Sequence, residues 1–149
     1  MSNSSECLFC RIARGIIPAH LVYESSRLVA FLDIQPIRPG HVLIVPREHF
    51  PYFDALPPEV AHEILDLGQK LAPVLRRQWG VERVGFMFTG TDVPHAHAHV
   101  LPLVAPTDIT SRRYIAEEQL TFRTAPRVPD PELAATATLL KAAFADPLS

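Results

Sequence analysis

Residues 94–101 read Pro-His-Ala-His-Ala-His-Val-Leu, which places a histidine at every second position. Successive side chains of a β-strand point to opposite faces, so this spacing predicts that His95, His97 and His99 share one face of a strand. The alternate positions hold alanine or valine, which are small enough for another layer to pack closely. One histidine on a strand is usually a packing or surface residue, whereas three on one face indicate chemistry.

The sequence around this stretch predicts an α+β fold. Short β-branched and aromatic segments, divided by prolines, predict strands at 21–24, 27–33, 41–46, 83–89 and 95–103. Apolar residues at helical spacing predict one main helix at 58–79, and residues 7–13 a short helical turn. Asp130 followed by Pro131 is typical of the N-cap of a C-terminal helix. We therefore expect a mostly antiparallel five-stranded sheet with one main helix and a C-terminal helix.

Length and charge limit the classes of function. The 149 residues fit one domain, and a formal net charge of −2 provides no field that would hold a nucleic acid non-specifically. No apolar run approaches the ~18 residues that a membrane-spanning helix needs. Residues 1–6 are polar and lack the pattern of a signal peptide. We therefore expect a cytoplasmic protein that binds neither nucleic acid nor membranes.

Spacing alone leaves two interpretations of the histidines open. An HxH pattern on a strand presents two metal ligands naturally, but Asp92 is the only carboxylate close by. Alternatively, one imidazole acts as a nucleophile while its neighbours orient it and polarise the substrate. The only two cysteines, Cys7 and Cys10, form a CxxC motif that fits a metal site or a redox pair.

Four blocks of this sequence resemble the histidine-triad (HIT) superfamily. They are His-Ala-His-Ala-His-Val-Leu at 95–101, Cys-Leu-Phe-Cys-Arg-Ile at 7–12, Phe-Leu-Asp-Ile at 31–34 and Pro-Gly-His-Val-Leu-Ile-Val-Pro-Arg-Glu-His at 39–49. The blocks follow the family's order and spacing, and the resemblance covers roughly residues 7–103.

The resemblance implies one HIT domain over residues 1–149, with a core at about 7–103 and a C-terminal extension with a helix at about 104–149. It also implies a homodimer, joined through a helix and a sheet edge. The candidates for that interface are the helix at 58–79 and the strand at 83–89.

The resemblance implies a hydrolase that cleaves nucleoside phosphoramidates or dinucleoside polyphosphates at the α-phosphate, with a purine nucleotide as substrate. His97 matches the family's nucleophile, which forms a nucleotidyl-histidine that water then hydrolyses. His99 matches a histidine that contacts and polarises the phosphate. His41 matches an upstream histidine near the site; a histidine satisfied within its strand is the alternative for that position.

Two further sets of residues follow from the resemblance. A structural zinc ion would bind to Cys7, Cys10, His49 and His95, which together form a closed tetrahedral site; buried thiols without metal are the alternative. The nucleotide would bind to Leu8, Phe9, Ile12, Phe31, Asp33, Ile34, Thr89, Thr91 and Asp92, with Asp33 accepting hydrogen bonds from the ribose hydroxyls.

The segment before the histidine run departs from the family's pattern. Thr89 stands where the best-known members have an asparagine, and Thr91 or Asp92 stands at the position of a phosphate-binding hydroxyl. A carboxylate at Asp92 repels a phosphate unless it is paired or turned away. An alternative function is therefore a zinc-stabilised nucleotide-binding module with little or no turnover.

Overall fold

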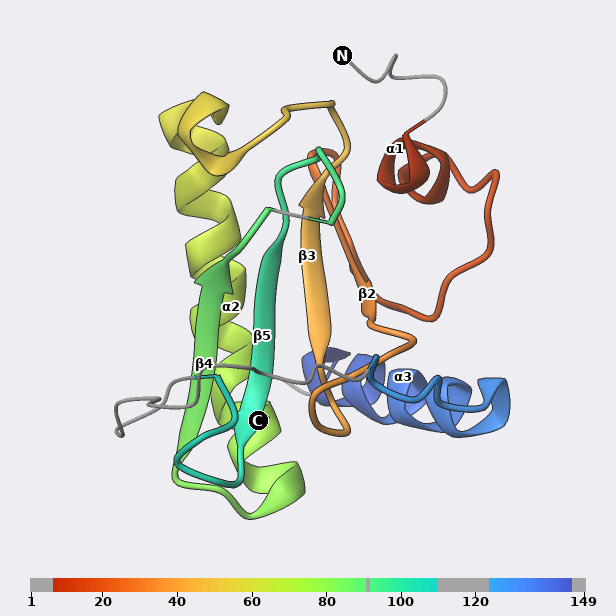
Figure 1. Ribbon diagram of the computed structural model, residues 1–149, viewed down its shortest axis with the longest axis vertical. Helices are drawn as coiled ribbons and strands as arrows, with labels where there is room; N and C mark the ends of the chain where they lie inside the picture. The colour runs from red at the N-terminus through yellow and green to blue at the C-terminus, as the bar shows by residue number, and fades with distance from the viewer. Residues whose placement is uncertain (1–6, 91, 110–123, 146–149) are drawn as a thin grey trace, which may run out of the picture.

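The computed structural model describes residues 7–90, 92–109 and 124–145. Five antiparallel strands form one sheet in the order β1-β2-β3-β5-β4 (Figure 1). The strands are β1 (Leu21–Glu24), β2 (Leu28–Leu32), β3 (Val42–Pro46), β4 (Arg83–Phe88) and β5 (Ala98–Leu103). The helices are α1 (Leu8–Ala13), the 3₁₀ turn η1 (Phe53–Ala55), α2 (Pro58–Trp79) and α3 (Asp130–Ala145). This architecture confirms the predicted α+β fold.

Alternate residues of the central strands enter two separate apolar clusters. In β3, Val42 and Ile44 join the larger cluster, whereas Leu43 and Val45 join the smaller one. All five residues of β3 are buried, as the continuous apolar run predicts. The sheet is therefore covered on both faces, and each face has its own role.

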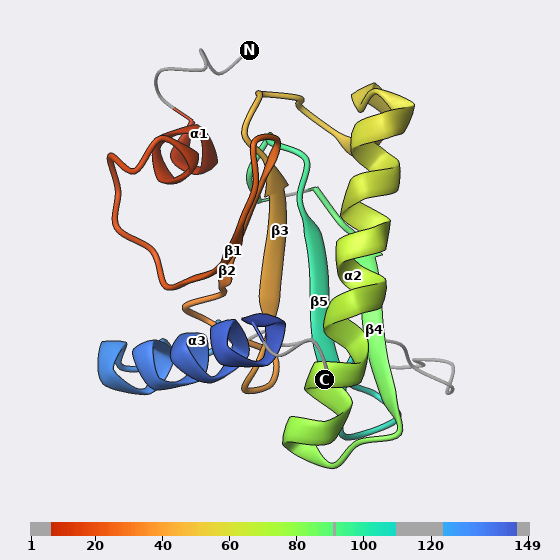
Figure 2. The ribbon, with the colours of Figure 1, turned by 180° about the vertical axis from the view of Figure 1, so that it is seen from behind.

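The long helix α2 covers one face (Figure 2). Its buried residues Ile64, Leu71 and Leu75 pack in the larger cluster with the residues that alternate with the histidines, Ala96, Ala98 and Val100. The small side chains of that group therefore meet the helix layer, as the sequence predicts. The helix begins at Pro58 and ends before Gly80, whose φ of 61° gives the left-handed C-cap that glycine favours.

The short helix α1 lies on the opposite face (Figure 1). Its residues Phe9, Cys10 and Ala13 form the smaller cluster with Phe31 and Leu43. The histidine side chains of the β5 segment project toward this face, where the ring of Phe9 packs against the rings of His95 and His97.

The prediction that the fifth strand begins at His95 is wrong, because the ladder begins at Ala98. The amide of His95 donates to the carbonyl of Val93 at 2.8 Å, and the amide of Ala96 donates to the carbonyl of Phe50 at 2.7 Å. These bonds replace pairing within the sheet and hold residues 95–96 beside the segment that follows β3. His95 is thereby brought close to His49.

The C-terminal helix starts one residue earlier than an Asp130 N-cap would give. Asp130 is the first residue of α3, and the amides of Glu132 and Leu133 donate to the carbonyl of Pro129. The Asp130 carboxylate instead contacts His20 and Arg127. A side chain that was predicted to cap a helix therefore points to neighbouring residues of the fold.

Gly40 positions the start of β3. Its φ of +88° lies in the region that favours glycine, and a Cβ atom there would lie 2.7 Å from the Trp79 ring. The chain passes close to the end of α2 at this point, and the next residue, His41, lies beside His99.

Candidate functional site

A cleft of about 860 Å³ opens on the face of the sheet that carries α1. The size is within the usual range for small-molecule sites. It is lined by α1, the segment before β1, the end of β2 and the histidine run, and also by residues 124–130. Of the predicted nucleotide-binding and catalytic residues, those that line it are Leu8, Phe9, Ile12, Phe31, Asp33, Ile34, Asp92, His97 and His99.

Two predicted residues that the structure describes, His41 and Thr89, are absent from the lining of the cleft. His41 is buried and Thr89 is exposed. Both contact His99, which does line the cleft. Thr91 lies outside the residues that the structure describes.

The His97 ring has a defined tautomer when neutral. Its Nδ1 lies 2.6 Å from the carbonyl oxygen of His95, and a carbonyl can only accept a hydrogen bond. Nδ1 therefore carries the proton, and Nε2 keeps its lone pair. The ring is 5% exposed, packs edge-on against Phe9 and lies 4.9 Å from the His99 ring, measured between centroids.

His41 and His99 form a directed hydrogen-bond chain. The amide of Ile37 donates to His41 Nδ1 at 3.1 Å, so the proton of a neutral His41 is on Nε2. His41 Nε2 donates to His99 Nδ1 at 2.9 Å, and His99 Nε2 donates to Thr89 Oγ1 at 3.1 Å. One backbone amide thus sets the tautomers of both rings.

Burial keeps these two rings neutral. Desolvation is the largest effect on His99, and together with His41 and His97 it lowers the pKa to about 4, although the carboxylates of Asp33 and Asp92 oppose the shift. Desolvation also lowers the pKa of His41, against the attraction of Asp33. At neutral pH both rings are therefore uncharged, and one donates a hydrogen bond to the other.

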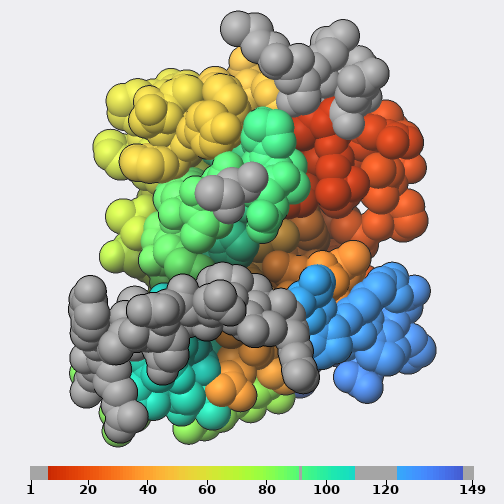
Figure 3. All heavy atoms as spheres, viewed as in Figure 1, coloured from red at the N-terminus to blue at the C-terminus, as the bar shows by residue number. Residues whose placement is uncertain are grey.

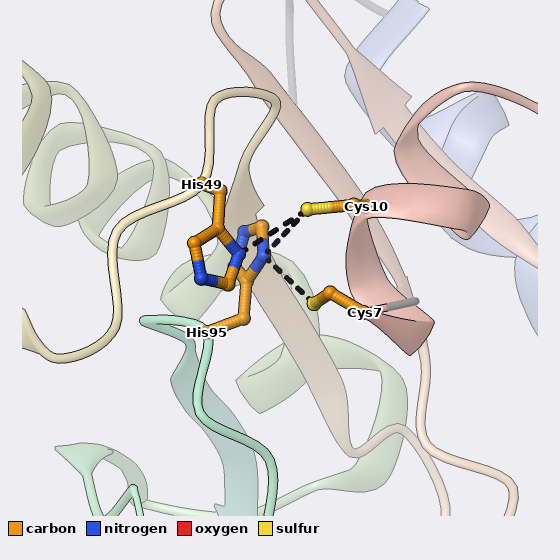
Figure 4. Close-up of side chains that lie close together, drawn as sticks. All are labelled: Cys7, Cys10, His49 and His95. Carbon is orange, nitrogen blue, oxygen red and sulfur yellow. Dashed lines mark hydrogen bonds between the residues drawn. The ribbon is translucent and has the colours of Figure 1, made fainter. Parts of the chain in front are cut away.

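Cys7, Cys10, His49 and His95 form a second cluster of side chains (Figure 4). His95 Nδ1 is 3.4 Å from each sulfur, and His49 Nδ1 is 3.3 Å from the Sγ of Cys10. Zn–S bonds of about 2.3 Å and Zn–N bonds of about 2.1 Å at a tetrahedral angle place sulfur and nitrogen about 3.6 Å apart. The four donors therefore have the spacing of a tetrahedral site.

The chemistry of these donors also fits a metal. His95 Nε2 donates to the carbonyl of Pro46 at 2.9 Å, so the lone pair of the neutral ring is on Nδ1 and faces the sulfurs. Without a metal, desolvation and the neighbouring Cys7 raise the pKa of Cys10 to about 11. A bound divalent cation reverses that preference, because a coordinating thiol loses its proton. The predicted set of four residues is thus brought together and is compatible with zinc.

Sequence reasoning missed one wall of the cleft. Thr124, Ala125, Arg127 and Asp130 line it together with the predicted residues. The stretch 104–129 has no periodicity that places it against a particular element. Only the helix-start signal at Asp130 pointed to order nearby.

The comparisons with known proteins agree with this geometry. Residues 14–105 match the HIT domain family, so the chain belongs to that family. It is 35% identical to a HIT-like protein of Methanocaldococcus jannaschii over 100 residues, 64% of this chain and 78% of that protein. It is 32% identical over 111 residues to an adenosine 5'-monophosphoramidase of Candida albicans, covering 68% of this chain and 73% of that one.

Solved structures show the same fold. A Zn-bound histidine triad family protein from Mycobacterium smegmatis is similar with a TM-score of 0.73 and 30% identity, covering 96% of each chain. A HIT-like protein from Bartonella henselae reaches a TM-score of 0.76 at 22% identity, covering 96% of this chain and 99% of that chain. Together the family and the named relatives support a HIT-family hydrolase, at the level of class. Within the described ranges, no helix is long and apolar enough to cross a membrane.

The lowered pKa of His99 predicts a pH dependence of stability. The folded pKa lies near 4, below the value of about 6.5 for an unfolded chain, so the unfolded state takes up the proton first. The stability that the neutral ring contributes is present above about pH 6.5 and is lost as the pH falls through about 4. We expect urea unfolding to show a smaller loss of stability between neutral pH and about pH 5 in His99→Gln than in the wild type.

An NMR titration of the imidazole nitrogens tests the cause directly. The His99 ring should stay neutral, with its proton on Nε2, through the range in which ordinary histidines titrate. In the unfolding experiment the control is His62→Gln, because His62 is exposed on α2. A His99 ring that titrates at the ordinary value would contradict the assignment.

Proposed function

We propose that this chain hydrolyses purine nucleoside phosphoramidates through a covalent nucleotidyl intermediate on His97. The observation that carries the proposal is the 2.6 Å contact from His97 Nδ1 to the His95 carbonyl. It leaves Nε2 unprotonated in a ring that lines the cleft. The monophosphoramidase relatives from yeasts support the same class of substrate.

The cleft offers a seat for a nucleoside. Leu8 and Ile34 line it and remain 45% and 46% exposed, which leaves apolar surface for a base to cover. Asp33 is fixed nearby, since one carboxylate oxygen accepts the amide of Gln35 at 2.8 Å and the other lies 3.9 Å from His41 Nε2. A carboxylate held in this way accepts hydrogen bonds from the ribose hydroxyls.

The reaction proceeds in two displacements. In the first, the Nε2 lone pair of His97 attacks the α-phosphorus, an N–P bond forms and the bond to the leaving amine breaks, with the amine taking a proton from water. The ring becomes cationic, and its Nδ1–H donates to the His95 carbonyl, which stabilises the charge. In the second, water attacks phosphorus and gives one proton to the hydroxide that the first step left in the solvent. The N–P bond breaks, the nucleotide is released and neutral His97 is restored.

The hydrogen-bond chain supports the phosphate. The neutral His99 ring lies next to His97 and has its Nε2–H directed at Thr89. We propose that the phosphate oxygens accept a hydrogen bond from this N–H when substrate is bound. His41 holds the ring from the other side through its hydrogen bond to His99 Nδ1. His41 is therefore a positioning residue that acts through His99.

Asp92 favours an amine over a phosphate as the leaving group. Its carboxylate lines the cleft with His97 and His99, and it is close enough to His99 to raise the pKa of that ring. Dinucleoside polyphosphates carry several negative charges into this region, which the carboxylate repels. A leaving amine is neutral once it has taken a proton, so the carboxylate does not repel it. We therefore place phosphoramidates before dinucleoside polyphosphates.

Loss of the nucleophile tests the proposal. We expect His97→Ala to reduce release of AMP and GMP from the corresponding phosphoramidates by at least about a thousandfold. His62→Ala, an exposed histidine on α2, should keep full activity. Wild-type reactions that are stopped in denaturant at alkaline pH, where an N–P bond survives, should contain a phosphorus-labelled chain whose label maps to residue 97.

The alternative of a nucleotide-binding module is an outcome of the same experiment. Wild-type protein that binds AMP or GMP without releasing either from any phosphoramidate or dinucleoside polyphosphate would contradict the hydrolase and favour the module.

Removal of the Asp92 charge should change the leaving-group preference. We expect Asp92→Asn to raise kcat/KM for diadenosine triphosphate relative to adenosine phosphoramidate by about tenfold at low salt, and by less at high salt, because ions screen an exposed charge. Asp66→Asn, an exposed carboxylate on α2, is the matched control. An unchanged ratio would show that Asp92 has no influence on the leaving group.

We further propose that zinc binds Cys7, Cys10, His49 and His95 as a structural ion. These four donors would close the tetrahedron and leave no position for substrate. The ion would tie α1 to the segment after β3 and to the start of the histidine run. Because His95 supplies the carbonyl that orients His97, the ion would also fix the nucleophile.

Metal analysis tests this site. We expect about one zinc per chain in protein prepared without chelator, and little in Cys10→Ser or His49→Ala. Chelator should lower the thermal midpoint of the wild type and leave that of the variants nearly unchanged. Wild-type protein with well under one zinc per chain, unchanged by added zinc, would exclude the proposal.

A further inference from the structure

The cleft has a wall that lies outside the matched HIT domain. The family match ends at residue 105, yet Thr124, Ala125, Arg127 and Asp130 line the same cleft as His97. Figure 3 shows the blue C-terminal residues directly beside the orange residues that follow β2. The site therefore includes residues of this chain's own C-terminal part.

Two hydrogen bonds attach this wall to the nucleoside side of the cleft. The amide of Val128 donates to the carbonyl of Ile34 at 2.8 Å, and Gln35 Nε2 donates to the carbonyl of Ala125 at 3.0 Å. Ile34 and Gln35 directly follow Asp33, the proposed ribose residue. The wall therefore lies beside the proposed ribose residue, where the base of a bound nucleotide would lie.

A group of three charged or titratable side chains stands on this wall. Asp130 Oδ1 lies 3.3 Å from His20 Nε2 and 3.1 Å from an Arg127 guanidinium nitrogen. The hydrogen bond from His20 is the largest effect that lowers the pKa of Asp130, and Arg127 adds to it. Both contacts use Oδ1 of the Asp130 carboxylate.

We propose that Arg127 and Asp130 select the base of the bound nucleotide and favour guanine over adenine. This inference rests on the proposed function, since it assigns a specificity to the same cleft. Both side chains keep more than half of their surface accessible, 55% for Arg127 and 63% for Asp130, so a ligand can reach them.

The chemistry of the two bases gives the direction of the preference. Guanine presents two adjacent donors, N1–H and the N2 amine, and a carboxylate accepts from both. Its O6 and N7 are acceptors that a guanidinium pairs with. Adenine has an unprotonated N1 where guanine has a donor, and this lone pair repels a carboxylate.

Binding of product nucleotides tests the proposal without depending on turnover. We would measure the Kd of GMP, IMP and AMP by calorimetry for the wild-type chain, Asp130→Asn and Arg127→Gln. Exposed residues on α2 provide matched controls, Asp66→Asn and Arg77→Gln. We expect the wild type to prefer GMP over AMP by roughly tenfold, and IMP, which lacks the N2 amine, to lie between them.

The variants then separate recognition from a structural role. Asp130→Asn and Arg127→Gln should each bring the GMP-to-AMP ratio close to one, and the controls should leave it unchanged. Equal weakening of all three nucleotides would show that the wall merely holds the cleft together and would overturn the proposal. Equal affinity of the wild type for GMP and AMP would overturn it too.

The failure of hydrolysis is distinguishable from the failure of this inference. If no phosphoramidate is cleaved but GMP remains preferred and the preference is lost in both variants, the proposed function fails and the base assignment stands. If no nucleotide binds the wild-type chain, both fail together.

Discussion

The positions of a few backbone groups determine what the buried histidines can do. The carbonyl of Pro46 accepts a hydrogen bond from Nε2 of His95, and the carbonyl of His95 accepts one from Nδ1 of His97. The amide of Ile37 donates a hydrogen bond to Nδ1 of His41, so the lone pair of that nitrogen is already used. A carbonyl cannot donate and an amide cannot accept, so each neutral ring is restricted to one tautomer. Metal binding, nucleophilic attack and phosphate contact need different nitrogens to be free.

These backbone groups are held by a sheet that is buried on both faces. The α2 layer packs closely on one face because the residues that alternate with the histidines are alanine and valine. The other face then carries the imidazoles against α1, with His41, His95 and His97 buried and His99 partly buried. Desolvation keeps His41 and His99 uncharged, so that neighbouring rings share hydrogen bonds at neutral pH instead of repelling one another.

The departure of residues 95–97 from the ladder has a functional consequence. A continuous strand would aim His95 and His97 into the same space. Because the amide of Ala96 pairs with Phe50, outside the sheet, the two rings diverge. His95 joins the cysteines and His49, whereas His97 faces the cleft. A candidate metal ligand and the proposed nucleophile therefore stand two residues apart.

The sequence by itself determined the face on which the chemistry lies, the four strands before the histidine run and the α2 helix, because these follow from local alternation and helical spacing. It also identified the four donors of the metal cluster through the family resemblance. The tertiary structure alone decided where β5 begins and which nitrogen of His95 and of His99 is free, since these depend on hydrogen bonds to residues distant in the chain. It also placed Arg127 and Asp130 in the cleft. Local pattern carries no information about such contacts, because a polar segment without periodicity is positioned only by the surface against which it packs.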